Sequence, residues 1–186
     1  MEFNNCIFLD FDGVLNCEEF YAEKYNHLRH DNIPLYKTVK KYLRKSLKKK
    51  EISGIEYYRS ETCPKRMELL NNLCKETNSC VVLSASMRRQ YSASELQEIF
   101  NNLGAKFTIL DKTGHHKSRI RGVEIKTWIM ANSEKFFGIP YFHFNNYVII
   151  DDDADMLECQ KLNFFQTDDY YGLTQDICKE IKRFLK

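Results

Sequence analysis

The chain has 186 residues, of which 43% are hydrophobic and 29% are charged, as is typical of one globular domain with a buried core. Its 28 Lys and Arg against 26 Asp and Glu leave a net charge of +2, which excludes the large positive field of a sequence-independent nucleic-acid binder. Any basic surface for a partner must therefore be local. The 13 Phe, 11 Tyr and one Trp, against seven Gly and three Pro, exclude a collagen-like or low-complexity chain.

The sequence carries no pattern of secretion or membrane insertion. Its first nine residues lack the basic start of a secretory signal, and no stretch approaches the roughly 20 apolar residues that span a bilayer. The seven cysteines are odd in number and form no C-x-x-C pair, so we expect reduced thiols and no structural zinc. We expect a cytoplasmic protein, a monomer or weak dimer, without a membrane partner.

Short apolar runs alternate with amphipathic stretches, which predicts an α/β fold: a mainly parallel sheet with helices on both faces. Five strands are predicted, at 6–9, 80–84, 107–110, 147–150 and 163–166, and an insert at 17–62 follows the first. Helices are predicted at 64–77, at 122–131 and from Thr174 onward. A further helix follows capping boxes at Ser92 and Ser94 and ends at Gly104.

The insert at 17–62 interrupts the strand and helix alternation of an otherwise single domain, 1–186. Residues 34–50 contain eight Lys or Arg and no acid. One interpretation is a solvated helix face, because Leu35, Val39 and Leu43 leave an apolar stripe opposite the lysines. The other is a small basic cap over a polyanionic substrate.

Two carboxylates follow the first predicted strand. Asp10 and Asp12 stand two residues apart, so an extended backbone turns both side chains toward one site at the carboxyl end of the strand. Open α/β sheets bind their ligands at that edge. Such a pair is tolerated mainly when the two groups divide roles or share a cation. A calcium loop is excluded, because Gly13 follows the second Asp directly and the closing Glu is missing.

A second acidic cluster follows the strand at 147–150. It begins with Asp151 and Asp152, and taken alone it is typical of an exposed helix start. If this edge lies beside that of Asp10 and Asp12, the four carboxylates form an oxygen-rich pocket that suits Mg²⁺. We therefore predict all four as metal-site residues.

Groups that bind phosphate lie between the two acidic clusters. Ser84 closes the strand at 80–84, where its hydroxyl and nearby backbone N–H groups can hold a phosphate oxygen; a routine turn residue is the alternative. Arg119, Arg121 and Lys126 are candidates for the cation that offsets the phosphate charge. Arg121, at a predicted helix start, is the best placed of the three.

With these residues in view, the sequence resembles the haloacid dehalogenase (HAD) superfamily of Mg²⁺-dependent phosphatases. Its first motif, D-x-D-G-[TV], is matched by residues 10–14. Ser84 matches the second motif, Arg121 the third, and Asp151 with Asp152 the fourth. A closer resemblance is to the small HAD domains of RNA-repair proteins, although the basic insert departs from that pattern.

The resemblance implies a Rossmann-like HAD core and a two-step phosphoryl transfer through an aspartyl-phosphate. Asp10 would be the nucleophile, and Asp12 the acid for the leaving alcohol and then the base for water. Ser84 and Arg121 would hold the transferring oxygens. Mg²⁺ would be bound by Asp10, the backbone carbonyl of Asp12 and Asp152, with Asp151 beside it. Further predicted contacts of the substrate are Gly13, Ala85, Arg88 and Lys126.

We favour a phosphorylated end of RNA or DNA, such as a 3′-phosphate, as the substrate. The RNA-repair resemblance, the lysines of 34–50 and the basic loop 115–121 motivate this choice. Tyrosines of the insert could stack bases, although aromatic residues in a short insert are more often its core: Tyr21, Tyr25, Tyr36, Tyr42, Tyr57 and Tyr58. The alternatives are a small-metabolite or nucleotide phosphatase, a phosphotransferase, and a catalytically silent HAD-like binding module.

Overall fold

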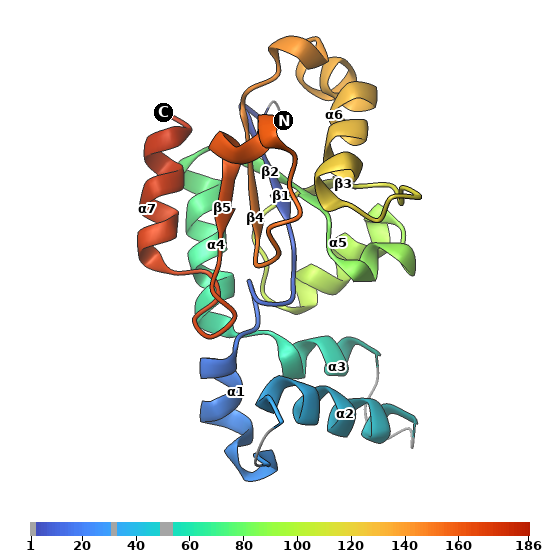
Figure 1. Cartoon of the computed structure of the whole chain (residues 1–186), viewed down its shortest axis with the longest axis vertical. Coiled ribbons are helices and arrows are strands. Elements are labelled where there is room, and N and C mark those ends of the chain that lie inside the picture. Colours follow the sequence, from blue (N-terminus) through green and yellow to red (C-terminus); the bar gives the residue numbers. More distant parts are fainter. Residues whose placement is uncertain (1–2, 31–32, 49–53) are drawn as a thin grey trace.

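A computed structural model describes residues 3–30, 33–48 and 54–186. Its centre is a five-stranded sheet in the order β3-β2-β1-β4-β5, in which every neighbouring pair is parallel (Figure 1). The strands are β1 (Asn5–Leu9), β2 (Ser79–Leu83), β3 (Ile109–Lys112), β4 (Tyr147–Asp151) and β5 (Phe164–Gln166). The predicted α/β fold with a parallel sheet is confirmed.

Helices cover both faces of this sheet, which explains why the central strands read as continuous apolar runs. The helices are α4 (Pro64–Glu76), α5 (Ala93–Asn102), α6 (Arg121–Phe137) and α7 (Gln175–Phe184). On one face, side chains of α4, α5 and α7 form a hydrophobic cluster with every second residue of the central strands, such as Ile7 and Leu9 of β1. On the opposite face Phe8 meets Trp128 of α6, with ring centroids 5.4 Å apart in an edge-to-face arrangement.

The edge strand β3 begins two residues later than the apolar pattern predicts. It contains the half-buried Asp111 and Lys112 in place of Phe107 and Thr108. These polar side chains are satisfied locally: Trp128 Nε1 donates to Asp111 Oδ2 over 2.7 Å, and Lys112 Nζ donates to the carbonyl of Arg88 over 2.8 Å. Hydrogen bonds from neighbouring elements thus compensate for polarity in an edge strand.

Helix boundaries follow the capping residues. Ser92 forms the N-terminal capping box of α5 with Glu95, whereas Ser94 lies inside the helix. Helix α6 ends six residues later than predicted, at Phe137, where Gly138 adopts the left-handed conformation with φ +66°. Short 3₁₀ turns occupy Asn26–Leu28, Ser86–Arg89, Tyr141–His143 and Glu158–Asn163.

In its described residues the insert contains three α-helices, which lie beyond the carboxyl end of the sheet (Figure 1). They are α1 (Glu18–Tyr25), α2 (Leu35–Lys48) and α3 (Gly54–Glu61). Leu35, Val39 and Leu43 of α2 pack with Tyr21 and other residues of α1 in a separate hydrophobic cluster. The apolar stripe predicted from the sequence is therefore the core of the insert, and the lysines lie on the opposite face.

Within the described ranges, none of the helices combines the length and apolar character needed to cross a bilayer.

Candidate active site

Two acidic segments meet at the carboxyl edge of the sheet because β1 and β4 are neighbours. Leu9 pairs in register with Ile150, and the N–H of Asp10 donates to the carbonyl of Ile150 over 3.0 Å. Asp10 thus stands beside Asp151 and Asp152. One carboxylate oxygen from each of these three residues lies within 4.8 Å of the others. The expected convergence of the two acidic segments is what the structure shows.

Gly13 lets the loop after β1 approach Asp152 closely. Its φ is +69°, and a Cβ placed there would lie 2.5 Å from Asp152 Cγ, well inside van der Waals contact. The turn is held by Asn16, whose Oδ1 accepts from the N–H of Gly13 over 2.9 Å. A glycine is therefore required here both for backbone conformation and for space.

Asp12 is not a member of the cluster of three carboxylates. Its Oδ1 accepts from Asn16 Nδ2 over 2.8 Å and pairs with Lys40 Nζ, also at 2.8 Å. Lys40 belongs to α2, so this ion pair joins the insert to the loop that carries Asp10 and Asp12. The sequence marks a basic segment in the insert, but its spacing does not distinguish Lys40 from the other seven cations.

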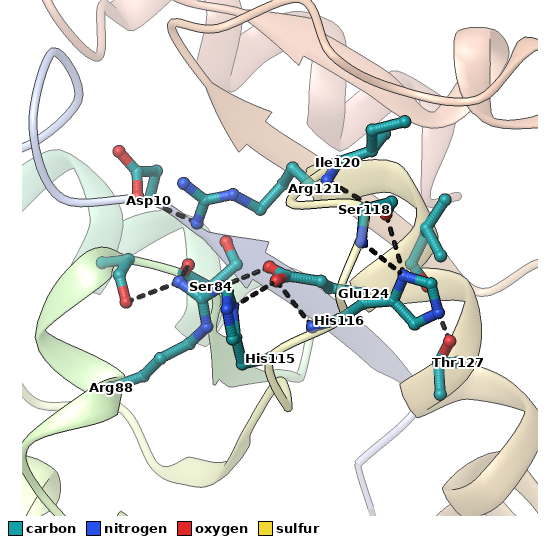
Figure 2. Close-up of polar contacts among 12 residues, drawn as sticks. Asp10, Ser84, Arg88, His115, His116, Ser118, Ile120, Arg121, Glu124 and Thr127 are labelled. Atoms are coloured by element: carbon teal, nitrogen blue, oxygen red, sulfur yellow. Dashed lines mark hydrogen bonds and ion pairs between the residues drawn. The ribbon is translucent and has the colours of Figure 1, made fainter.

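Arg121 supplies a cation to the carboxylates from the first residue of α6. Its Nη1 lies 3.2 Å from Asp10 Oδ1, and its Nε lies 3.7 Å from Asp151 Oδ2. Figure 2 shows the guanidinium directed at Asp10. The other candidate cations, Arg119 and Lys126, are exposed, and Lys126 lies five residues further along the helix. Arg121 is therefore the cation that this part of the structure places against the acidic cluster.

The start of α6 is fixed by the acidic loop after β4. The N–H of Arg121 donates to Asp155 Oδ2 over 2.9 Å, and the N–H of Gly122 donates to the Asp155 carbonyl over 3.2 Å. A Cβ on Gly122 would lie 2.5 Å from the backbone nitrogen of Leu157. The Arg-Gly pair thus lets α6 dock on this loop, and Asp155 neutralises free N–H groups at the helix start.

Ser84 lies directly after β2 with its side chain fully buried. Its N–H donates to the carbonyl of Leu9 over 2.8 Å, which holds it beside the β1 edge. Its hydroxyl finds no hydrogen-bond partner among the described residues. A buried hydroxyl without a partner is costly, so a ligand oxygen at this position would satisfy it.

Arg88 lies beneath this edge and is 3% exposed. Its guanidinium donates to Glu124 and to the carbonyl of Ser84, and it reaches the carbonyl of Ala85 over 2.9 Å (Figure 2). Glu124 is equally buried and also accepts from the N–H of His116 over 3.0 Å. These contacts let Arg88 position the turn at Ser84 and Ala85, and its predicted contact with substrate stays a prediction.

Comparison with known proteins places this arrangement in a family. The chain matches the model of the HAD domain in Swiss Army Knife RNA repair proteins over residues 6–177. The chain belongs to this family. No curated protein and no solved structure shows a significant match to it. Membership confirms the predicted HAD superfamily and supports a phosphatase-type hydrolase.

The HAD domain concentrates negative charge at its carboxyl edge. Burial, and then repulsion from neighbouring carboxylates, raises the pKa of Asp152 to about 7. Burial likewise raises the pKa of Asp10 to about 6 and that of Asp151 to about 8, while Arg121 acts in the opposite direction on both. The raised pKa values mean that three ionised carboxylates are unstable here without a compensating cation.

A divalent cation fits this site in charge and in donor type. Four carboxylates of the two motifs, paired with Arg121 and Lys40, leave a charge of −4 + 2 = −2 when all are ionised. Asp151 Oδ2 is buried and makes no hydrogen bond within the described residues. HAD domains generally use Mg²⁺, and clustered carboxylate oxygens are the donors it prefers. Asp10, Asp151 and Asp152 are the residues that would hold it.

A cavity of about 250 Å³ opens between this edge and the insert. Asp10, Asp12 and Ala85 lie on the sheet side. The opposite wall comes from α2, α3 and the segment after Ser86, and it includes Lys40, Arg44, Tyr57, Tyr58, Glu61 and Tyr91. The site therefore combines a carboxylate floor with a wall that contains two cations, aromatic rings and the carboxyl group of Glu61.

The insert tyrosines divide between this wall and the insert core. Tyr21 and Tyr25 are buried in the cluster of α1 and α2, which matches the alternative interpretation of these residues. Tyr57 and Tyr58 are half-buried and line the cavity. Gly13 lines an adjoining cavity with Asp12 and Asp152.

Proposed function

We propose that this HAD domain is a Mg²⁺-dependent phosphomonoester hydrolase that acts through an aspartyl-phosphate on Asp10. The observation that carries the proposal is the buried Asp10 carboxylate, which faces both the Asp151–Asp152 pair and the Arg121 guanidinium at the floor of an open cavity. Asp12 lies in the same cavity but outside the carboxylate cluster, so the two aspartates have different surroundings and can divide roles.

In the first step a carboxylate oxygen of Asp10 attacks phosphorus, and the bond between phosphorus and the ester oxygen breaks. Asp12, in its acid form, gives its proton to the leaving alcohol oxygen. In the second step water attacks the phosphorus of the aspartyl-phosphate and gives its proton to Asp12. Asp10 is then released as a carboxylate together with inorganic phosphate.

The remaining residues hold the transferring group in place. Arg121 is already at the nucleophile, where its guanidinium can donate to a phosphoryl oxygen in place of Asp10 Oδ1. The unpartnered hydroxyl of Ser84 can donate to a second phosphoryl oxygen. Bound Mg²⁺ would supply charge neutralisation of the phosphoryl oxygens.

The favoured substrate within this proposal is a phosphorylated polynucleotide end, such as a 3′-phosphate. Support comes from the RNA-repair family and from the cations and tyrosines of the cavity wall. A nucleotide or small-metabolite phosphatase is the second candidate, because a cavity of about 250 Å³ is enough for only one small group. A silent binding module is disfavoured, because the acidic, hydroxyl and cationic positions are all filled by chemically competent residues.

A phosphatase assay across several substrates tests the proposal. We expect phosphate release from 3′- or 5′-phosphorylated RNA and DNA, nucleoside monophosphates or p-nitrophenyl phosphate, and loss of that release when EDTA removes Mg²⁺. Asp10→Asn should abolish turnover because the amide is not a nucleophile, while Asp12→Asn should slow it by roughly 10²- to 10⁴-fold. Near-wild-type Mg²⁺-dependent activity in Asp10→Asn would contradict the nucleophile assignment. Addition of alcohol acceptors to the assay separates transfer from hydrolysis.

A further inference from the structure

An open groove of about 590 Å³ runs over α2, next to the catalytic cavity. We call it the α2 groove. It is lined by Tyr36 and by six cations, which are Lys37, Lys40, Lys41, Arg44, Lys45 and Lys48. Lys41, Lys45 and Lys48 are exposed. The groove therefore presents one sign of charge to solvent.

The α2 groove adjoins the catalytic cavity. Lys40 and Arg44 line both hollows. Lys40 also reaches Asp12, with Nζ 2.8 Å from Oδ1. A substrate whose terminal phosphate lies at Asp10 would therefore leave the cavity past these two cations and arrive on α2.

The cavity is too small for a long substrate to remain inside it. Its volume of about 250 Å³ lies below the range of roughly 300–1,000 Å³ found for pockets that enclose drug-sized ligands. One nucleoside-sized group fills such a space. Any further nucleotides must follow a surface outside, and the adjoining surface lined by cations of α2 is the α2 groove.

Most of the charge of α2 does not serve the folding of the helix, although Lys45 and Lys48, in its last turn, complement the helix dipole. Its sequence contains no acid, so the cations at 37, 41 and 45 stand in like-charged pairs four residues apart, which weakens a helix. Its contact with the insert core is made instead by Leu35, Val39 and Leu43. A cationic face that opposes helix stability is explained by a polyanion that neutralises it from outside.

Building on the proposed function, we propose that the α2 groove binds the phosphodiester backbone of a single-stranded polynucleotide whose terminal phosphate reaches Asp10. The tyrosines distinguish this ligand from an acidic peptide. Tyr36 lies in the groove, and the half-buried Tyr57 and Tyr58 lie in the cavity, where ring faces can stack on bases.

The test uses two triple variants with the same change of charge. Lys41→Ala/Lys45→Ala/Lys48→Ala removes three cations of the groove. The control, Lys135→Ala/Lys161→Ala/Lys179→Ala, removes three exposed lysines of other elements. Both are made in the Asp10→Asn background, and fluorescence anisotropy follows the binding of a labelled 3′-phosphorylated single-stranded RNA of about 12 nucleotides over a range of salt concentrations.

Counterion release predicts the size of the effect. Each phosphate contact on a single strand contributes about 0.7 to the steepness of the fall of log affinity with log salt concentration. Because the groove variant lacks three cations, this slope should be shallower by about 2. At about 0.1 M salt the same relation predicts on the order of 100-fold weaker binding. In the active background, the ratio of kcat/KM for the oligonucleotide to kcat/KM for a nucleoside 3′-monophosphate should fall as well. Lys45→Glu should shift the slope in the same direction.

Equal affinity and equal salt dependence in the two triple variants would overturn the proposal. Competition by poly-glutamate as effective as that by an oligonucleotide of equal charge would overturn the assignment to nucleic acid. The binding measurement does not need turnover. If the wild-type protein hydrolyses none of the phosphomonoesters, the proposed function fails, and the anisotropy comparison still decides whether the groove binds a polynucleotide.

Discussion

At the scale of single residues, Gly13 is the position where backbone conformation and metal-site geometry depend on each other. We predict that Gly13→Ala lowers stability by ~1–3 kcal/mol, because it forces φ +69° on a residue with a Cβ. The substitution should also weaken Mg²⁺ binding. The added Cβ would lie only 2.5 Å from Asp152 Cγ, so the Asp152 side chain would have to move. Urea unfolding and calorimetric titration with Mg²⁺ measure the two effects.

Gly138→Ala is the matched control for this substitution. Gly138 has φ +66°, but a Cβ added there would meet nothing within 4 Å, so this variant carries the backbone strain without the contact. It should lose stability and keep its affinity for Mg²⁺. Equal losses of Mg²⁺ affinity in the two variants would show that the contact with Asp152 is unimportant.

At the scale of one element, α2 combines a buried apolar stripe with an exposed face of one charge. We predict that Lys41→Glu raises the stability of the protein, because a glutamate at this exposed position converts the like-charged pairs with Lys37 and Lys45 into attractive ones. The gain should be ~0.2–0.5 kcal/mol for each pair and should shrink in high salt. Thermal unfolding at low and high salt measures it, and a loss of stability at low salt would contradict the repulsion argued for α2.

At the scale of the whole molecule, the buried carboxylates couple folding to pH and to Mg²⁺. An unfolded aspartate titrates near pH 3.9, whereas the folded pKa values of Asp10, Asp152 and Asp151 are about 6, 7 and 8. Between roughly pH 4 and 8 the metal-free folded state binds more protons than the unfolded state. The contribution of these three carboxylates to the stability of the folded state is therefore greatest below this window and falls as the pH rises through it.

Mg²⁺ should reverse much of this loss, since it replaces the protons at Asp10, Asp151 and Asp152. We expect Mg²⁺ to raise the melting temperature more at pH 8 than at pH 5, relative to protein in EDTA. With Mg²⁺ bound, stability should still fall with rising pH, but less steeply. The remaining dependence comes from Glu61, which lies outside the cluster and whose pKa burial raises to about 7. An equal effect of Mg²⁺ at both pH values would contradict the coupling.

The sequence by itself determined the parallel sheet and the residues of its carboxyl edge. Uninterrupted apolar runs require strands that are covered on both faces, and polar groups that follow such runs must emerge at one edge. Asp10, Ser84 and Asp151 were predictable for this reason, because each follows or ends its own strand. The start of β3 was not, since a hydrogen bond from Trp128 of α6 compensates for the polarity of Asp111.

Only the tertiary structure decided which side chains contact one another across elements. Lys40 is one of eight similar cations until the packing of α2 brings it to Asp12. Arg88 is a cation of the type that binds phosphate, and only the packing shows its ion pair with Glu124. Such pairings depend on where an element packs in three dimensions, and they join residues far apart in the chain. Local periodicity carries no information about them, because it reports only which face of an element is buried.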